Sequence, residues 1–254
     1  MKIGIYGGTF NPPHLGHLAA ARTALDALKL DKLILMPAAV PPHKVLPENS
    51  PAQEHRLAMV ERMADAMERP GAVEVSTLEL EREGKSYTSD TLEAIHRQYP
   101  EAELWLLMGT DMFLTLHLWH EPGTILRLAG ICAFGRSEQD GEDVFAPQRE
   151  FLSKTYPDAR IATITLPGLV DISSTQLREL LARERGSEYL LPSVYGYILM
   201  NRLYQIIVYR YRYFRAVQGS FSGGAVFSCS GKENVLLYFG IQHGCLRVLV
   251  FLIR

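Results

Sequence analysis

A chain of 254 residues is long enough for one sizeable α/β domain with an appendage, and its 47% hydrophobic and 21% charged residues exclude a disordered or fibrous protein. Residues 1–204 contain 20 Lys and Arg against 27 Asp and Glu, and this mildly acidic body argues against duplex nucleic acid as the main partner. Three cysteines without paired spacing, Cys132, Cys229 and Cys245, predict neither a disulfide framework nor a zinc site, and the reducing cytoplasm is the expected compartment.

The first thirty residues combine an apolar strand, a glycine turn and a histidine pair. Residues 2–6 predict a buried strand, and the apolar residues of 18–29 recur at helical spacing. Between them lies GGTFNPPHLGH at 7–17, where an α/β protein binds a nucleotide phosphate, because backbone N–H groups and the positive end of a helix converge there. His14 and His17 are one helical turn apart and would offer two donors to a polyphosphate; a metal half-site and a solvated helix start are the alternatives.

Residues 33–36 predict a second buried strand, and a stiff PPHK loop follows at 41–44. The loop would present His43 and Lys44 just beyond the carboxyl end of a strand, where open parallel sheets bind ligands, although a wet surface turn explains the same residues. Ser50 as N-cap, with Pro51 in the next position, predicts a scaffold helix to about residue 68.

Residues 73–75 predict a short strand, and 104–108 predict the central one. Between these strands, Ser86 and Thr88 precede a run with helical periodicity, and helix capping alone accounts for their hydroxyls. Asp111 comes directly after the central strand, where its carboxylate could accept hydrogen bonds from ribose hydroxyls or cap the following helix.

Trp119 stands in a polar setting at 118–121, where its indole could stack on a pyridine-type ring or pack partly buried in the body of the protein. Residues 131–134 predict a strand in which Cys132 is inert core. Arg136, at the exit of that strand, offers a bidentate fork for a phosphate. The polar and acidic residues 137–149 predict a surface loop.

Residues 161–166 predict the last strand of the body, and DISSTQLR follows at 171–178. Ser173 and Gln176 have the spacing of a capping box, which predicts a helix to about residue 185. A helix start with three hydroxyls and Arg178 one turn in forms a second anion cradle, the alternative being an ordinary capped helix with a solvated arginine. Residues 191–204 predict one more helix.

Residues 205–254 differ from the rest of the chain. They contain six basic residues and a single acid, an alternating YRYRY segment at 209–213 that predicts a strand, and a Gly/Ser-rich stretch at 218–224 typical of a linker. The apolar run at 248–253 is far too short to span a bilayer, and the chain begins without a signal-peptide pattern. We interpret 205–254 as an extension of unknown role, such as a shifted reading frame would produce, and expect it to be poorly ordered.

The stretches at 7–17 and 171–178 resemble the two signatures of the HxGH nucleotidyltransferase superfamily. Together with PPHK at 41–44, SYTSDTL at 86–92 and LWH at 118–120, they make residues 1–204 similar to bacterial nicotinate-nucleotide adenylyltransferases. The resemblance implies an α/β fold, a Rossmann-like doubly wound parallel sheet in a nucleotidyltransferase domain at 1–204, with 205–254 as a non-homologous C-terminal extension. It also implies an enzyme of NAD biosynthesis that transfers the adenylyl group of ATP to nicotinate mononucleotide, giving deamido-NAD and pyrophosphate.

The resemblance assigns roles to the candidate residues. His14, His17 and Arg178 would be catalytic and grip the phosphates of ATP. The ATP-binding residues would be Gly7, Gly8, Thr9, Phe10, Asp111, Ser173, Ser174 and Thr175. The mononucleotide would be bound by His43, Lys44, Thr88, Trp119, His120 and Arg136, of which His120 stands where the family often has Tyr. Mg²⁺ would enter with ATP, and no side chain is assigned as a metal ligand.

The partners expected are therefore ATP and nicotinate mononucleotide, with no nucleic acid and no membrane, and a homo-oligomer is left open. Two other functions remain. The same chemistry on nicotinamide mononucleotide is one, because the choice between acid and amide rests on a few hydrogen bonds near Thr88 and Trp119. A nucleotide-binding protein without turnover is the other; it would keep the glycine turn and lose donors from one of the two signatures.

Overall fold

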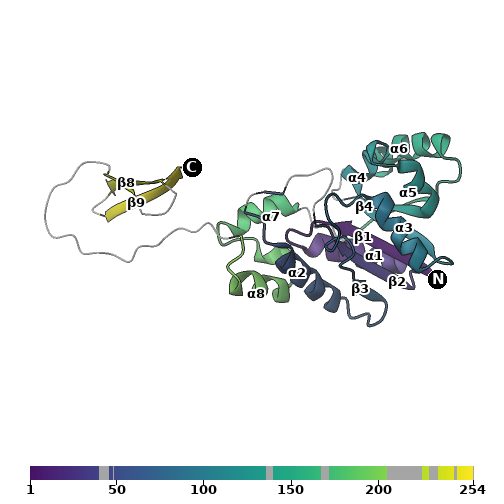
Figure 1. The fold of residues 1–254 in the computed structure, drawn as a ribbon, viewed down its shortest axis with the longest axis horizontal. Coiled ribbons are helices and arrows are strands. Elements are labelled where there is room, and N and C mark those ends of the chain that lie inside the picture. Colours follow the sequence, from purple (N-terminus) through teal and green to yellow (C-terminus); the bar gives the residue numbers. More distant parts are fainter. Residues whose placement is uncertain are drawn as a thin grey trace. The chain divides into compact units, whose positions relative to one another are not determined.

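The computed structural model describes residues 1–39, 46–47, 49–135, 140–166 and 172–204, together with the backbone of three strands between 225 and 253. The chain divides into two compact units, Met1–Ile207 and Val208–Arg254, and Figure 1 shows the elements of both.

A six-stranded parallel sheet forms the centre of the first unit. Its strands lie in the order β3-β2-β1-β4-β5-β6, and all neighbours run parallel. The chain builds outward from β1 to β3 on one side and then crosses to β4 on the other, so the strand order reverses between β1 and β4. Ligands bind at such a reversal point in open α/β sheets. The strands are β1 (Lys2–Gly8), β2 (Lys32–Pro37), β3 (Val73–Val75), β4 (Glu103–Gly109), β5 (Ala129–Phe134) and β6 (Ile161–Ile164).

In the described part of the first unit, eight α-helices connect and cover these strands, with two short 3₁₀ turns between them. The helices are α1 (Leu15–Ala27), α2 (Gln53–Asp65), α3 (Thr88–Gln98), α4 (Thr110–Leu114), α5 (Pro122–Leu128), α6 (Glu142–Thr155), α7 (Ser174–Leu181) and α8 (Pro192–Met200). The 3₁₀ turns are η1 (Leu116–Leu118) and η2 (Ser187–Tyr189). The predicted doubly wound α/β fold is confirmed.

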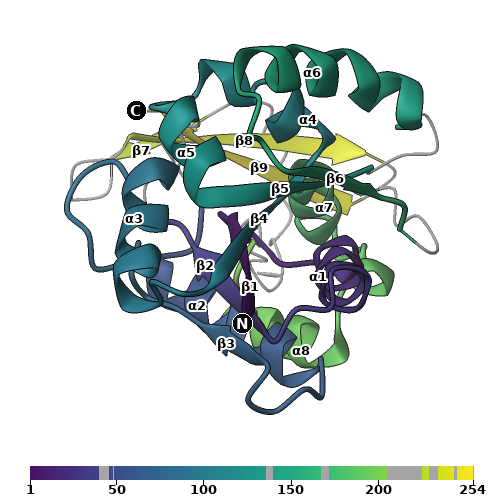
Figure 2. The ribbon, with the colours of Figure 1, turned by 90° about the vertical axis from the view of Figure 1, so that its right-hand side faces the viewer.

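Both faces of the sheet are buried, because helices pack on each of them. Alternate residues of β2 point to opposite faces: Ile34 joins the core that includes buried residues of α3 to α6, and Leu35 joins the core that includes α1 and α2. Figure 2 shows α3 and α5 on one side of β1 and β4, and α1 on the other. A third cluster, in which Met59 of α2 meets Leu177 of α7 and Ile198 of α8, attaches the end of the domain to α2.

Several predicted elements differ from the structure. Residues 142–149 belong to α6 and not to a surface loop, because Phe145, Gln148 and Leu152 bury one face of that helix at helical spacing. The predicted N-cap role of Ser50 is wrong, since α2 begins at Gln53 with Ala52 as its cap. The helix expected to reach residue 185 ends at Leu181.

The described residues of the second unit form three antiparallel strands in the order β7-β8-β9, which are β7 (Ala225–Ser228), β8 (Asn234–Gln242) and β9 (Cys245–Ile253). The apolar run at 248–253 lies within β9. The strand predicted at 209–213 and the linker predicted at 218–224 lie outside the described residues. No helix among the described residues is long and apolar enough to cross a membrane.

Candidate active site

The glycine turn leads from β1 directly into the first helix. Gly7 is exposed, and a Cβ atom added to it would meet no other atom within 4 Å, so the backbone there is open to a ligand. Phe10, with φ of +45°, turns the chain through the left-handed region, and its buried ring packs edge-on against Tyr6 with centroids 5.6 Å apart. Packing of Phe10 against Tyr6 thus fixes the turn on its buried side, and the backbone at Gly7 stays open on the exposed side.

The two histidines stand at the N-terminus of α1. His14 is the N-cap residue, its ring centroid lies 3.8 Å from that of His17, and both side chains are half-buried. The Nδ1 atom of His17 accepts the backbone N–H of His14 at 3.2 Å. A neutral His17 ring bound in this way carries its proton on Nε2, which is then a donor on the far side of the ring. The described residues hold no group of three or more His, Cys, Asp or Glu that could bind a metal ion.

The second signature folds as the sequence predicts. The Ser173 hydroxyl accepts the backbone N–H of Gln176 at 3.2 Å, and Gln176 Oε1 accepts the backbone N–H of Ser173 at 2.9 Å. This reciprocal pair is the predicted capping box, which is confirmed. Backbone N–H groups of the first turn of α7 therefore keep a fixed direction at the helix start, where an anion is stabilised.

Two hydrogen bonds join the two signatures. The Ser174 hydroxyl donates to the carbonyl of Pro12 at 3.2 Å, across 162 residues of sequence. Arg178 Nη1 donates to the carbonyl of Asn11 at 2.8 Å, and Nη2 of the same side chain donates to Thr175 Oγ1 at 3.1 Å. The N-termini of α1 and α7 are thereby held next to each other, and both present partial positive charge.

Arg56 adds a buried cation beside the glycine turn. It is 2% exposed, and its guanidinium donates to the carbonyls of Thr9 at 3.0 Å, Ala38 at 2.6 Å and Ala39 at 3.3 Å. Burial lowers the pKa of the guanidinium, because the charged form loses its hydration. The segments after β1 and β2 are thus fastened together by one side chain, which also places a positive charge at this edge of the sheet.

Two predicted mononucleotide elements lie side by side. The ring of Tyr87, directly before Thr88, faces the ring of His120 with centroids 4.2 Å apart. Trp119 is half-buried and packs against the core that includes α3 to α6. Thr88 is the first residue of α3, whose N-cap is Tyr87 without a side-chain bond, so the predicted capping by hydroxyls is wrong.

The remaining predicted residues fall into two groups. Asp111 is exposed in the first turn of α4, and the N-cap of that helix is Gly109, so the capping alternative for Asp111 is wrong. His43, Lys44 and Arg136 lie outside the described residues.

Comparisons with known proteins identify the family of the chain. The family described as Cytidylyltransferase-like matches residues 5–180. A protein of Trichlorobacter lovleyi named "Probable nicotinate-nucleotide adenylyltransferase" is 38% identical over 217 residues, covering 81% of this chain and 100% of the relative. Proteins of the same name from Carboxydothermus hydrogenoformans and Neisseria meningitidis are each 37% identical and cover 80% of this chain and 98% of the relative. The chain belongs to the nicotinate-nucleotide adenylyltransferase family.

Solved structures share the fold of this family member. The nicotinic acid mononucleotide adenylyltransferase of Plasmodium falciparum complexed with NaAD has a TM-score of 0.64 at 18% identity, covering 80% of this chain and 97% of that one. The same protein complexed with APC gives a TM-score of 0.65. About a fifth of this chain lies beyond what its relatives match.

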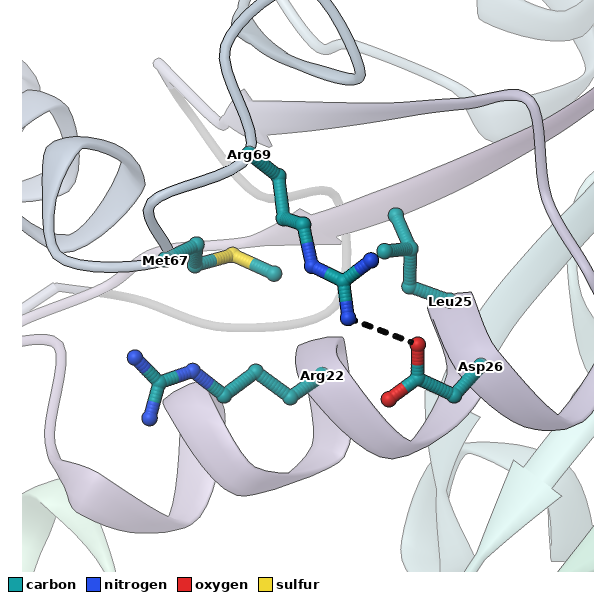
Figure 3. Close-up of a pocket in the computed structure, with 5 residues that line it drawn as sticks. All are labelled: Arg22, Leu25, Asp26, Met67 and Arg69. Carbon is teal, nitrogen blue, oxygen red and sulfur yellow. Dashed lines mark hydrogen bonds and ion pairs between the residues drawn. The ribbon is translucent and has the colours of Figure 1, made fainter.

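A separate small pocket lies away from the signatures of this adenylyltransferase-family chain. It has a volume of about 230 Å³, and no predicted site residue lines it. Figure 3 shows Arg69 reaching toward Asp26 of α1, with Nη2 and Oδ1 3.2 Å apart. Because both side chains are more than half exposed, we interpret this pair as a weak surface link.

Sequence reasoning missed several residues that shape the site. Arg56 stands in a polar-looking helix and gives no signal of burial. The contacts of Ser50, Tyr87 and Tyr204 are equally absent from local patterns. Asn11 lies inside the first signature, so the sequence places it in the glycine turn, but no sequence pattern predicts its contacts.

Proposed function

We propose that this protein transfers the adenylyl group of ATP to nicotinate mononucleotide, giving deamido-NAD and pyrophosphate in NAD biosynthesis. The observation that carries the proposal is the junction of the two signatures, in which Ser174 and Arg178 bond to the carbonyls of Pro12 and Asn11. A single triphosphate at this junction would meet two helix N-termini and the His14–His17 pair at once.

The chemistry requires positioning more than proton transfer. The attacking group is a phosphate oxygen of the mononucleotide, which is already ionised at neutral pH, so neither a general base nor a covalent nucleophile is needed. The oxygen attacks the α-phosphorus of ATP, and the bond from that phosphorus to the bridging oxygen of pyrophosphate breaks. Catalysis then consists of holding two anions in line and neutralising the charge that grows on the leaving pyrophosphate.

His17 is the residue we place nearest the reacting phosphorus. Its Nδ1 is occupied by the backbone of His14, so Nε2–H is the group that donates to the α-phosphate. His14 would bind a neighbouring phosphate oxygen. Gly7, Gly8, Thr9 and Phe10 would let the nucleotide lie close against the backbone of the turn.

The second signature would bind the β- and γ-phosphates. Ser173, Ser174 and Thr175 supply backbone N–H groups at the start of α7. The two bonds that Arg178 makes within the protein use one N–H of each terminal nitrogen, and a guanidinium has five N–H groups, so further donors remain for phosphate oxygens. Asp111, in the first turn of α4, would accept hydrogen bonds from ribose.

Nucleotidyltransferases generally use ATP together with a divalent metal ion, and we propose Mg²⁺ for this protein. Mg²⁺ keeps several of its waters and is bound largely through substrate phosphates, so it enters here as part of the substrate. That arrangement requires no dedicated cage of protein carboxylates.

The mononucleotide would lie against the segment where Tyr87 faces His120. Thr88 and its backbone would hold the nicotinate carboxylate, Trp119 and His120 would line the pyridine ring, and His43, Lys44 and Arg136 would contact the phosphate. A site built for a carboxylate rejects the amide because its donors would then lack an acceptor of equal strength.

Pyrophosphate release tests the proposal directly. The purified chain is incubated with Mg·ATP and either nicotinate mononucleotide or nicotinamide mononucleotide, with ATP alone as the blank. We expect turnover with the acid to exceed turnover with the amide. Equal or greater turnover with the amide would reassign the substrate, and ATP binding without pyrophosphate release would identify a nucleotide-binding protein without turnover.

A further inference from the structure

The side chain and the carbonyl of Asn11 join three distant segments of the chain. Asn11 is 1% exposed; its Nδ2 donates to Ser50 Oγ at 2.9 Å, and its Oδ1 accepts the hydroxyl of Tyr204 at 2.8 Å. Its carbonyl accepts Arg178 Nη1 at 2.8 Å. A residue of the glycine turn is therefore held by the segment before α2, by α7 and by the turn that follows α8.

Tyr204 lies near the end of the first unit, four residues past α8. Burial raises the pKa of its hydroxyl above the usual 10, and the nearby positive charges of Arg178 and Arg56 oppose this shift without cancelling it. The hydroxyl is consequently protonated at neutral pH and acts as the donor to Asn11 Oδ1. Both arginines bind carbonyls of the glycine turn, Arg178 that of Asn11 and Arg56 that of Thr9.

We propose that Tyr204 and Asn11 are positioning residues for ATP: the Tyr204 hydroxyl fixes the Asn11 side chain, and Asn11 fixes both the glycine turn and Arg178. Neither side chain has to touch the nucleotide. The inference rests on the proposed function, and it adds that the last turn of the domain sets the affinity for ATP.

The bond geometry explains why one hydroxyl matters. Without it, Asn11 Oδ1 is a buried acceptor with no donor in the described residues around it, and such a group costs free energy. The side chain relieves this cost by rotating toward water, which also breaks the bond to Ser50 and shifts the carbonyl that holds Arg178. The loss of this hydroxyl should therefore weaken the binding of ATP more than that of the mononucleotide. The residues proposed for the mononucleotide, Thr88 and Trp119, lie on other segments, at the start of α3 and directly after η1.

The decisive variant is Tyr204→Phe, which removes only the hydroxyl. We expect the KM for ATP, and the Kd for ATP measured by calorimetry without mononucleotide, to rise about tenfold, the effect of leaving one buried acceptor unsatisfied. The KM for nicotinate mononucleotide should change less than about twofold.

Tyr197→Phe is the matched control. Tyr197 lies on α8, and its hydroxyl bonds to His55 Nδ1 on α2 at 2.9 Å, so the variant loses a comparable hydrogen bond elsewhere in the same part of the fold. Its unfolding midpoint should fall about as far as that of Tyr204→Phe, with ATP parameters as in the wild type. If the KM and Kd for ATP were the same in the two variants, Tyr204 would have only a structural role, and the proposal would be wrong.

A double-mutant cycle checks that Tyr204 acts through Asn11. In the Asn11→Ala background, Tyr204→Phe should have no further effect on ATP affinity. Asn11→Asp keeps an acceptor for Tyr204 and for the Ser50 hydroxyl, and should restore most of the affinity that Asn11→Ala loses. Additive losses would contradict the inference. A wild type that binds ATP without turnover would refute only the proposed function, because the Kd comparison still tests the positioning; a wild type that does not bind ATP would refute both.

Discussion

His17 owes its orientation to the backbone of its own helix. The bond from the His14 N–H to Nδ1 fixes both the tautomer and the direction of the ring before any nucleotide is present. A donor aligned in advance loses little free energy when charge develops on the phosphate.

We therefore predict that His17→Ala lowers kcat by about 100-fold or more, the effect of removing one charge-stabilising donor. The fold should be largely spared, since the ring is half-buried at a helix start. Circular dichroism and pyrophosphate release check both points. His96→Ala, a substitution on α3 outside the proposed site, is the control, and a kcat near the wild-type value in His17→Ala would remove His17 from the mechanism.

A substitution at Gly7 should affect the binding of ATP without affecting the stability of the fold. An added methyl group meets no protein atom within 4 Å, so Gly7→Ala should leave the unfolding midpoint unchanged and weaken ATP binding by occupying the space of the nucleotide. Gly196→Ala in α8 also adds a methyl group to open space, and should stabilise the helix by up to about 1 kcal/mol with unchanged ATP affinity. Calorimetric titration with ATP distinguishes the two; equal affinities would show that Gly7 does not face the nucleotide.

Local chemistry could be predicted at the residue scale, and distant contacts could not. The Ser173–Gln176 box is correct because both partners lie within one turn and the pattern contains the whole interaction. Ser50 carries the same N-cap signal, yet its hydroxyl accepts from Asn11, 39 residues away. Arg56 bonds to three carbonyls that no spacing rule connects to it.

At the scale of elements, the segment before α3 is held by a buried acid. Arg82 Nη1 donates to Thr91 Oγ1 at 3.1 Å, and Thr91 in turn donates to Glu79 Oε1 at 2.8 Å. The Ser86 hydroxyl bonds to the Glu79 carbonyl at 3.3 Å. This chain of hydrogen bonds fixes the entry of α3, where Thr88 is predicted to meet the substrate.

The Glu79 carboxyl predicts a pH dependence. Burial raises its pKa above 4.5, although Thr91 and Arg82 lower it. A carboxyl that binds its proton more tightly in the folded state contributes stability below its unfolded pKa, and this contribution is lost as the pH rises through the folded value. Glu79→Gln should remove this loss of stability at higher pH, because the glutamine side chain does not titrate.

The free energy of unfolding of Glu79→Gln should therefore increase relative to that of the wild type between pH 4 and pH 7.5, because only the wild type loses stability as the pH rises. Urea denaturation at the two pH values measures it, and Glu83→Gln, at an exposed position nearby, controls for the change in net charge. A difference that shrinks toward pH 7.5 would contradict the role of burial.

The order of strands and helices was predictable because buried parallel strands appear as continuous apolar runs. β4 and β5 are the clearest cases, with few polar residues between their ends. α6 was missed because its face of Phe145, Gln148 and Leu152 includes a polar residue, and Pro147 interrupts the pattern. The burial of Gln148 depends on its bond to the Phe113 carbonyl at 3.2 Å, which lies on another helix.

At the scale of the whole molecule, the first unit contains the complete set of described site residues. Its three core clusters draw on residues up to Leu203 and Tyr204, and the relatives match about four fifths of the chain while being covered almost entirely.

We predict that a chain ending at Tyr204 unfolds at the same midpoint and releases pyrophosphate at the same kcat as the full chain. Thermal unfolding and the pyrophosphate assay, run side by side on both proteins, provide the comparison. A truncated chain that precipitates or loses ATP affinity would show that residues 205–254 support the domain.

The hydrogen bond between Asn11 and Tyr204 spans 193 residues of sequence. During synthesis, Asn11 is among the first residues to leave the ribosome, and almost the entire domain is synthesised before its partner Tyr204. Contacts of such long separation form late in folding. A nascent chain, or one that ends before Tyr204, should therefore bind ATP weakly at its glycine turn. Tight binding of ATP would then be limited to chains synthesised at least as far as Tyr204.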